Sequence, residues 1–207
     1  MAPEPVTAER VYATLKSAVL GGRFPPRSLL VTQSIADEYG TSISPVRDSM
    51  QRLVGEGMLE PQPNGGFRVP DLSKKDLRDL YVWHEQLVRL ALSDRGDPEA
   101  FETIDIDERD LLEPATIAEA TAAWFEAIAG RTSNREIRGA LGRASDRLHY
   151  VRICEGRVLK GLAEELLLMR QRAVAGGHRT LRDAVGAYHR RRLRRIPLIH
   201  AALHDPD

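Results

Sequence analysis

The sequence predicts a mainly α-helical protein with two domains, the first of which carries a small β-hairpin. Three observations lead to this prediction. Apolar residues recur at helical spacing through most of the 207 residues. The segment Pro63-Asn-Gly-Gly66, a strong tight-turn signal, separates two short apolar segments. Beyond residue 70, no segment alternates between apolar and polar residues as a strand would. We therefore expect domains at 1–70 and 71–207.

The first 70 residues predict three helices and the hairpin. The first helix follows Thr7 and ends at Gly21-Gly22. Thr32 can cap a second helix, which stops at Gly40. The third is capped by Ser42 or Ser44 and closes at residues 55–57. A short helix, a turn, an amphipathic helix and a hairpin, in that order, are typical of a winged helix-turn-helix (HTH), which places a helix in a DNA groove.

The remainder predicts an all-helical bundle of roughly six helices. Apparent capping boxes, Ser73 with Asp76 and Ser133 with Glu136, begin two of them. The second of these helices is expected to continue through Val151. The last segment, 178–203, is expected to be interrupted near Gly186 and again at Pro197. Residues 94–113 are acidic and weakly periodic, which favours a loop with a short helix.

Composition and charge exclude several classes of protein. No apolar run approaches the roughly 20 residues that span a bilayer, and no secretory signal is present. Cys154 is the single cysteine, which excludes a disulfide framework and fits a reducing cytoplasm. The net charge is zero, but residues 71–115 carry −7 and residues 116–207 carry +7. Neutrality argues against strong non-specific DNA binding and does not exclude binding through local patches.

Several segments, in order and spacing, resemble the reader head of GntR-type bacterial transcription regulators. They are Val19-x-x-Gly22, Pro26, Leu30, Gly40-Thr-Ser-x-Ser-Pro-Val-Arg47 and Leu53-x-x-Glu56-Gly57. The remainder resembles the helical effector domain of the FadR-like branch, through Leu77-Arg-Asp-Leu-Tyr81, Trp124-Phe125 and Ser133-Asn134. The resemblance implies a cytoplasmic, non-enzymatic homodimer that binds palindromic double-stranded DNA operators and associates with the nucleoid. We expect a repressor that a small carboxylate effector modulates.

The DNA contacts are expected at the start of the third helix, because its N-terminal end enters the major groove. Arg47 is the leading candidate for a phosphate or base contact. The other candidates lie on the third helix, the second helix and the wing: Ser42, Ile43, Ser44, Gln33, Asn64, Gly65 and Arg68. Ile43 can meet a thymine methyl where the family commonly has arginine. That departure indicates a different operator or looser specificity.

The resemblance also implies a divalent metal such as zinc, held in the branch by one aspartate and three histidines. His178 and His200 stand at two of these positions, and Glu126 replaces a third ligand. Ala122 stands where the aspartate would be. Two histidines and one carboxylate could hold a metal with open positions. The alternative is that both histidines are partly buried polar groups with backbone partners.

Two other functions compete with a ligand-controlled regulator. In one, the degenerate helical domain serves only dimerisation or protein docking. In the other, more remote, Glu126, His178 and His200 form a metal-dependent hydrolase site, although no nucleophile motif accompanies them. The basic run His189-Arg-Arg-Arg-Leu-Arg-Arg195 is expected to pair with the acidic segment 94–113 rather than to bind nucleic acid.

Overall fold

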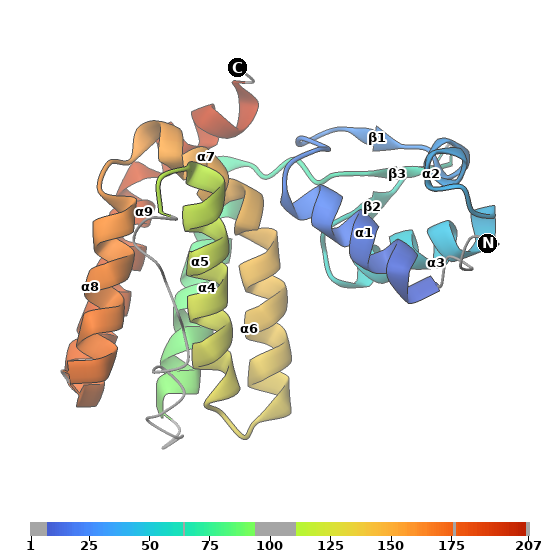
Figure 1. The fold of residues 1–207 in the computed structure, drawn as a ribbon. Helices are drawn as coiled ribbons and strands as arrows, with labels where there is room; N and C mark the ends of the chain where they lie inside the picture. Colours follow the sequence, from blue (N-terminus) through green and yellow to red (C-terminus); the bar gives the residue numbers. More distant parts are fainter. Residues whose placement is uncertain (1–7, 64, 94–110, 176, 206–207) are drawn as a thin grey trace. The chain divides into compact units, whose positions relative to one another are not determined.

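A computed structural model describes residues 8–63, 65–93, 111–175 and 177–205, and for residues 175, 177 and 178 it describes the backbone only. The chain divides into two units, Met1–Asp71 and Leu72–Asp207, which we call the N-terminal domain and the helical domain (Figure 1). Across the described ranges, none of the helices combines the length and the apolar character that crossing a bilayer requires.

The N-terminal domain is a winged helix-turn-helix. Its elements are α1 (Ala8–Leu20), β1 (Leu29–Leu30), α2 (Thr32–Tyr39), α3 (Ile43–Gly55), β2 (Glu60–Pro61) and β3 (Phe67–Arg68). Gly40 caps α2 with φ 61°, a left-handed conformation that glycine adopts without steric cost, and the chain then turns into α3. Thr32 is the first residue of α2 rather than its cap, and its hydroxyl lies 3.7 Å from the sulfur of Met50.

The wing is a three-stranded antiparallel sheet in the order β1-β3-β2. β2 and β3 form the expected hairpin, with Glu60 opposite Arg68. β1 was not expected, because the sequence predicts only an extended connection after Pro25-Pro26. It pairs with β3, Leu30 opposite Phe67, and both side chains are buried in the core of the N-terminal domain. A two-residue strand carries no periodicity for sequence analysis to detect.

A polar cluster fixes α3 against α1. Glu56, just beyond α3, accepts hydrogen bonds from the Tyr12 hydroxyl at 2.6 Å and from Lys16 Nζ at 2.9 Å. The Arg52 guanidinium lies 3.5 Å from the centroid of the Tyr12 ring and forms an ion pair with Glu9 at 3.0 Å. Beneath this cluster the fully buried Leu15, Val46 and Leu53 belong to the same core. The orientation of α3 is thus set by both packing and charge.

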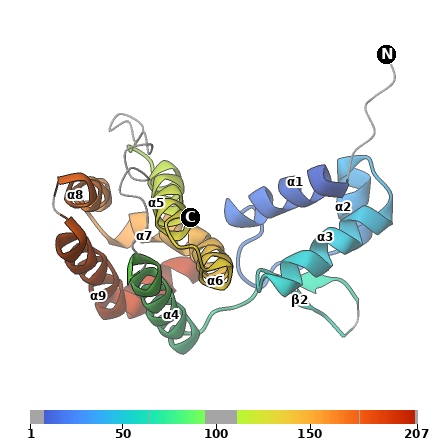
Figure 2. The ribbon, with the colours of Figure 1, turned by 90° about the horizontal axis from the view of Figure 1, so that it is seen from below.

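The helical domain contains α4 (Lys74–Ser93), α5 (Pro114–Gly130), α6 (Arg135–Arg147), α7 (His149–Val158), α8 (Leu162–Ala175) and α9 (Gly177–His204). Each described helix packs on at least one other: α4 on α5, α6 and α9, α5 on α6 and α7, and α8 mainly on α9. Figure 2 shows α8 beside α9, at one edge of the bundle. The Ser73–Asp76 capping box forms as expected, with Asp76 N donating to Ser73 Oγ at 3.2 Å and Ser73 N donating to Asp76 Oδ2 at 3.1 Å.

Three details of the helical domain differ from the sequence-based expectation. Asn134, not Ser133, is the N-cap of α6, and its side chain accepts from the backbone N–H groups of Glu136 and Ile137. The expected single helix through Val151 is divided at Leu148 into α6 and α7. Conversely, α9 runs without interruption through Gly186 and Pro197. Pro197 is exposed, so solvent can satisfy the backbone carbonyl that loses its partner.

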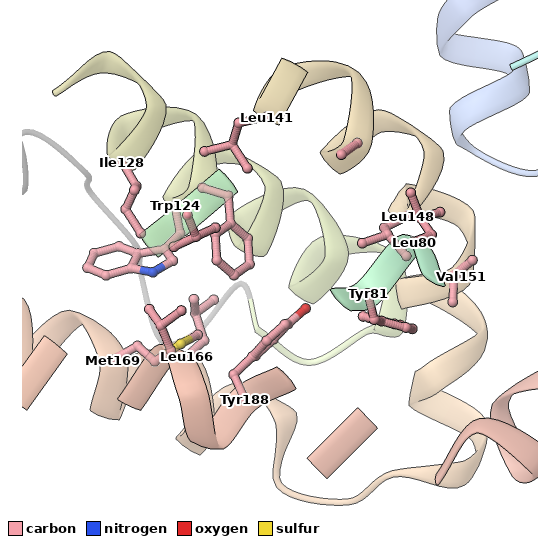
Figure 3. Packing of buried hydrophobic residues seen from close by; sticks show 14 of the residues in the cluster. Leu80, Tyr81, Trp124, Ile128, Leu141, Leu148, Val151, Leu166, Met169 and Tyr188 are labelled. Atoms are coloured by element: carbon pink, nitrogen blue, oxygen red, sulfur yellow. The ribbon is translucent and has the colours of Figure 1, made fainter. Parts of the chain in front are cut away.

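The core of the helical domain draws on all six of these helices. Trp124 and Phe125 of α5 are fully buried. Leu166 and Met169 of α8 cover Trp124 from one side (Figure 3). Figure 3 also shows Tyr81 of α4 and Tyr188 of α9 among these apolar groups. Their hydroxyls give the core its polar interior, described below.

Candidate nucleic-acid interface and interior polar cluster

One side of α3 is exposed to solvent. Val46, Ser49, Met50 and Leu53 face inward and are buried. The opposite side is solvent-exposed and consists of Ile43, Ser44, Arg47, Asp48 and Gln51, with the N-cap residue Ser42 exposed next to it. Ile43 is 44% exposed, so its side chain is accessible from solvent. The three predicted α3 contacts and Ser42 therefore share one accessible surface, which we call the α3 face.

Arg47 differs from the other basic residues of this domain. Lys16, Arg23, Arg27, Arg52 and Arg68 each form an ion pair with a carboxylate of the chain. Arg47 is exposed and, within the described part of the chain, forms neither an ion pair nor a hydrogen bond. A guanidinium with five free donors on an exposed helix face can bind a phosphate or the edge of a guanine.

The candidates outside α3 lie in different surroundings. Gln33 is exposed on α2, and its amide donates to Asp37 Oδ1 at 2.7 Å within the same helix. Gly65 is exposed at the tip of the wing with φ 89°. Arg68 pairs across the wing with Glu60 at 3.1 Å, so a DNA contact there would compete with that pair. Asn64 lies outside the described residues.

The interior of the helical domain holds a chain of hydrogen bonds through two buried histidines. His189 Nδ1 lies 2.8 Å from the backbone oxygen of Val185, so this nitrogen carries the proton. His189 Nε2 must then accept, and His84 Nδ1 donates to it at 2.9 Å. His84 Nε2 in turn accepts from Arg152 Nη2 at 3.3 Å. We call Arg152, His84 and His189 the histidine chain.

Burial keeps both rings of the histidine chain neutral. Removal from water lowers the pKa of His189 to about 3, and the nearby guanidinium groups act in the same direction. Burial, together with Arg152, also lowers the pKa of His84 well below 6.5. In each neutral ring the nitrogen without a proton accepts a hydrogen bond from a neighbour. The histidine chain therefore fixes the tautomer of both rings.

Next to this chain lies a second group of charges, which we call the arginine–carboxylate cluster: Arg152, Glu155, Glu165, Arg191 and Arg192. Arg192 is 2% exposed and donates from Nε to Glu155 Oε2 at 2.9 Å and from Nη1 to Glu165 Oε2 at 2.7 Å. Glu155 also accepts from the Tyr81 hydroxyl. The Arg192 guanidinium stacks 3.3 Å from the centroid of the Tyr188 ring.

Arg152 has no carboxylate partner in the described residues, although it is 3% exposed. Its neighbours are neutral acceptors: Ser145 O and Oγ at 3.2 and 3.0 Å, and the Tyr188 hydroxyl at 3.3 Å. A cavity of about 10 Å³ adjoins these groups, which is room for about one water molecule. Its lining is polar on the α7 and α9 sides and mainly apolar on α5 and α8: Ile117, Ala118, Thr121, Arg152, Glu155, Leu162, Glu165, Leu166, Met169, Tyr188 and Arg192.

Residues 7–69 match the family model described as "Bacterial regulatory proteins, gntR family". The match covers the whole winged helix-turn-helix that carries the α3 face. The chain is a GntR-family HTH transcription regulator.

Comparisons with individual proteins agree with this assignment. HTH-type transcriptional regulator YdhC of Bacillus subtilis is 26% identical over 69% of this chain and 68% of its own length. HTH-type transcriptional repressor GlaR of Escherichia coli is 27% identical, with 44% of each chain covered, so that likeness spans less than half of either protein. The solved structure of E. coli McbR/YncC superposes with a TM-score of 0.70 at 19% identity, covering 92% of this chain and 97% of that one. The last comparison shows that the likeness in fold extends beyond the winged helix-turn-helix and through the helical domain.

The metal site that the resemblance implied stays a prediction, because the structure describes the side chains of only two of its three expected ligands, Glu126 and His200. Glu126 is exposed on α5, and Ala122, in place of an aspartate, has no donor atom. The His200 ring is half-buried and packs at 4.5 Å on that of His204. The side chain of His178 lies outside the described residues. Among the residues that are described, no three His, Cys, Asp or Glu side chains lie together as metal ligands would.

Sequence analysis did not single out the histidine chain or the arginine–carboxylate cluster. It treated Arg192 as part of a basic run that pairs with the segment 94–113, whereas Arg192 is buried and pairs with Glu155 and Glu165. The helical spacing within α9 could have indicated that Arg192 is buried. It lies on one side of the helix with four other residues, and all five are buried: 181, 185, 188, 192 and 196. The acidic partner expected for the run, 94–113, falls almost entirely outside the described residues.

Proposed function

We propose that this GntR-family regulator is a repressor that binds palindromic operators as a homodimer, and that its helical domain responds to a small carboxylate. The relative GlaR is named a transcriptional repressor, which supports repression rather than activation. Three features of the chain support the remainder: the α3 face, an apolar stripe on α4, and the guanidinium groups of the helical domain.

The observation that carries the proposal is Arg47. It stands on the α3 face with Ser42, Ile43 and Ser44, and it is not committed to any acidic neighbour of the described chain. Hydroxyl groups suit phosphate or base contacts, and the exposed Ile43 side chain suits a thymine methyl. Because the reader head is otherwise balanced by internal ion pairs, Arg47 supplies its most available positive charge for DNA.

The homodimer is supported by the outer face of α4. Val82, Trp83 and Leu90 are 42%, 51% and 47% exposed and fall within about 100° of one another around the helix. An exposed tryptophan flanked by two branched aliphatic residues is costly in water and typical of the centre of an interface. A second copy of α4, brought against the first by two-fold symmetry, would cover the stripe and present two α3 helices to two half-sites.

The effector is supported by Arg152, a buried cation that adjoins the cavity and has no carboxylate partner in the part of the chain that the structure describes. The ligand-independent alternative is favoured by the small size of that cavity, about 10 Å³, which excludes a ligand unless side chains move. For protein docking through α8 the support is divided: Leu166 and Met169 are 1% and 2% exposed and belong to the core, whereas Leu168 between them is 44% exposed.

The test combines operator mapping with one substitution. Genome-wide mapping of bound sites gives the operator, and fluorescence anisotropy then measures its affinity for wild type and for Arg47→Ala. We expect a several-fold to hundred-fold loss, about 1–3 kcal/mol. If Arg47 binds a phosphate, the loss is similar on all sequences and the salt-dependence slope falls by about 0.9. If it binds a base, the loss is confined to the cognate operator.

Arg143→Ala is the matched control, because it removes one exposed positive charge from the helical domain. Wild-type operator affinity in Arg47→Ala, or an equal loss in Arg143→Ala, would contradict the assignment of the α3 face.

A further inference from the structure

The two carboxylates that hold Arg192 differ in how accessible they are. The Glu155 side chain is 1% exposed and is fixed from its other oxygen by the Tyr81 hydroxyl. The Glu165 side chain is 17% exposed and lies on α8, which packs mainly on α9 at one edge of the bundle. Glu165 also lies 3.4 Å from the half-exposed Arg191. An anion that enters from solvent could therefore exchange with Glu165 and not with Glu155.

Charge bookkeeping in the arginine–carboxylate cluster also favours an incoming anion. The cluster holds three guanidinium groups and two carboxylates, and within the described residues Arg152 is the guanidinium that pairs with neither carboxylate. A buried charge without a counter-ion is expensive, whereas exchanging one carboxylate for another leaves the number of buried charges unchanged. An anion bound between Arg152 and Arg192 would serve both guanidinium groups at once.

The walls of the cavity indicate the rest of the ligand. Beyond the charged groups the lining is mainly apolar, and its α8 part consists of Leu162, Leu166 and Met169. Glu165 belongs to the same short stretch of α8. Release of Glu165 from Arg192 would therefore free the helix that supplies this apolar wall, and the cavity would enlarge next to the two guanidinium groups.

We propose that Glu165 is a built-in carboxylate that occupies the anion site of the helical domain, and that a small monocarboxylate with an apolar body binds by displacing it. This inference rests on the proposed effector response and adds its mechanism. The Glu165–Arg192 pair closes α8 over the site in the free protein. The ligand carboxylate takes the place of the Glu165 carboxylate on Arg192, gains Arg152 as a second partner, and places its apolar body against α5 and α8.

The test removes the internal competitor. Glu165→Gln keeps the size of the side chain and loses its charge. Glu164→Gln is the control, because it removes the same charge from the preceding residue, which is exposed and does not line the cavity. Isothermal titration with acetate, hexanoate and benzoate, and with hexan-1-ol as the uncharged probe, measures binding to both variants and to wild type. If the open state is 1–10% populated in wild type, Glu165→Gln gains roughly 10- to 100-fold in hexanoate or benzoate affinity.

Hydrogen exchange supplies a second measurement that does not depend on the probe. The α8 amides should exchange faster in ligand-free Glu165→Gln than in Glu164→Gln, because the closing contact is lost. Equal carboxylate affinities in the two variants, or α8 exchange that Glu165→Gln leaves unchanged, would overturn the proposal. If Glu165→Gln binds hexanoate tightly and operator binding ignores the ligand, the displacement stands and the proposed effector response fails. If operator binding responds to a carboxylate that Glu165→Gln binds no more tightly than wild type does, the proposed effector response stands and the displacement of Glu165 fails.

Discussion

Mild acid should destabilise the helical domain through its buried histidines. Burial lowers the pKa of His189 to about 3, and burial with the charge of Arg152 lowers that of His149 to about 4. In the unfolded chain both rings regain a value of about 6.5. Between these limits the unfolded state binds protons that the native state does not. Stability is therefore complete above about pH 6.5 and is lost as the pH falls toward the folded values.

The magnitude follows from the difference in pKa. At pH 5 the unfolded form of each ring is about 97% protonated while the native form is almost neutral, which costs roughly 2 kcal/mol per histidine relative to pH 8. His189 and His149 together cost about 4 kcal/mol, and His84, whose pKa is also lowered, adds to this. That is a large share of the 5–15 kcal/mol typical of a folded domain.

The carboxylates can be separated from this effect by the choice of pH. Burial acts to raise the pKa of Glu56, but hydrogen bonds from Tyr12 and Lys16 hold it below the usual 4.5. A group of this kind contributes stability that is lost only below about pH 4.5. The window from pH 8 to pH 5 therefore reports on the histidines.

The assay is urea unfolding, followed by far-ultraviolet circular dichroism at pH 8, 7, 6 and 5, for wild type, His149→Gln and His189→Gln. Each substitution removes one titrating ring, so each variant should lose about 2 kcal/mol less than wild type over this range, whatever its stability at pH 8. A free energy of unfolding that stays constant from pH 8 to pH 5 would refute the reasoning. The same conclusion would follow if the free energy of unfolding of His189→Gln fell as steeply with pH as that of wild type.

Three further predictions concern the interface, the bundle and the reader head. Trp83→Ala should shift the protein toward monomer in analytical ultracentrifugation while its circular dichroism spectrum is retained; an unchanged dimer affinity, or a monomeric wild type, would exclude the α4 stripe. Gly156→Ala should lower the free energy of unfolding by roughly 1–3 kcal/mol, because the new Cβ would lie 2.5 Å from Pro114 Cβ. In the control Gly142→Ala the new Cβ would have nothing within 4 Å, so this substitution should stabilise α6 by up to about 1 kcal/mol. Equal effects of the two substitutions in urea unfolding would contradict this packing. Glu56→Gln should cost about 1–3 kcal/mol in urea unfolding by weakening the bonds to Tyr12 and Lys16, and a loss below about 0.5 kcal/mol would show that α1 and α3 are held by packing alone.

Local signals predicted the N-terminal domain closely. Gly40, the α3 stripe and the Pro63–Gly66 turn each act within a few residues, and each lies where the sequence placed it. The exposed face of α3 followed from the same periodicity, since the residues off a buried stripe must face solvent. What the sequence could not supply was the availability of Arg47, because that depends on which other cations are already paired through space.

The helical domain was predicted less well in its details. Gly186 and Pro197 ordinarily interrupt helices, yet α9 continues through both. A side chain at Gly186 would have its Cβ 2.8 Å from Arg190 Nη1 and 3.1 Å from Arg89 Nη2, so the glycine makes room for two long side chains. Propensity at one position contributes about 1–3 kcal/mol, which the packing of α9 on α4, α7 and α8 outweighs.

The sequence by itself determined the class of this protein, because helix caps, glycine turns and the α3 stripe are local features that fix a winged helix-turn-helix and a following bundle. The tertiary structure alone decided what the interior of the bundle contains. His84, Arg152, Glu155, His189 and Arg192 come from three helices and meet only after those helices pack. Their pKa values, tautomers and counter-ions depend on burial and on distances across the fold, and no spacing along the chain specifies either quantity.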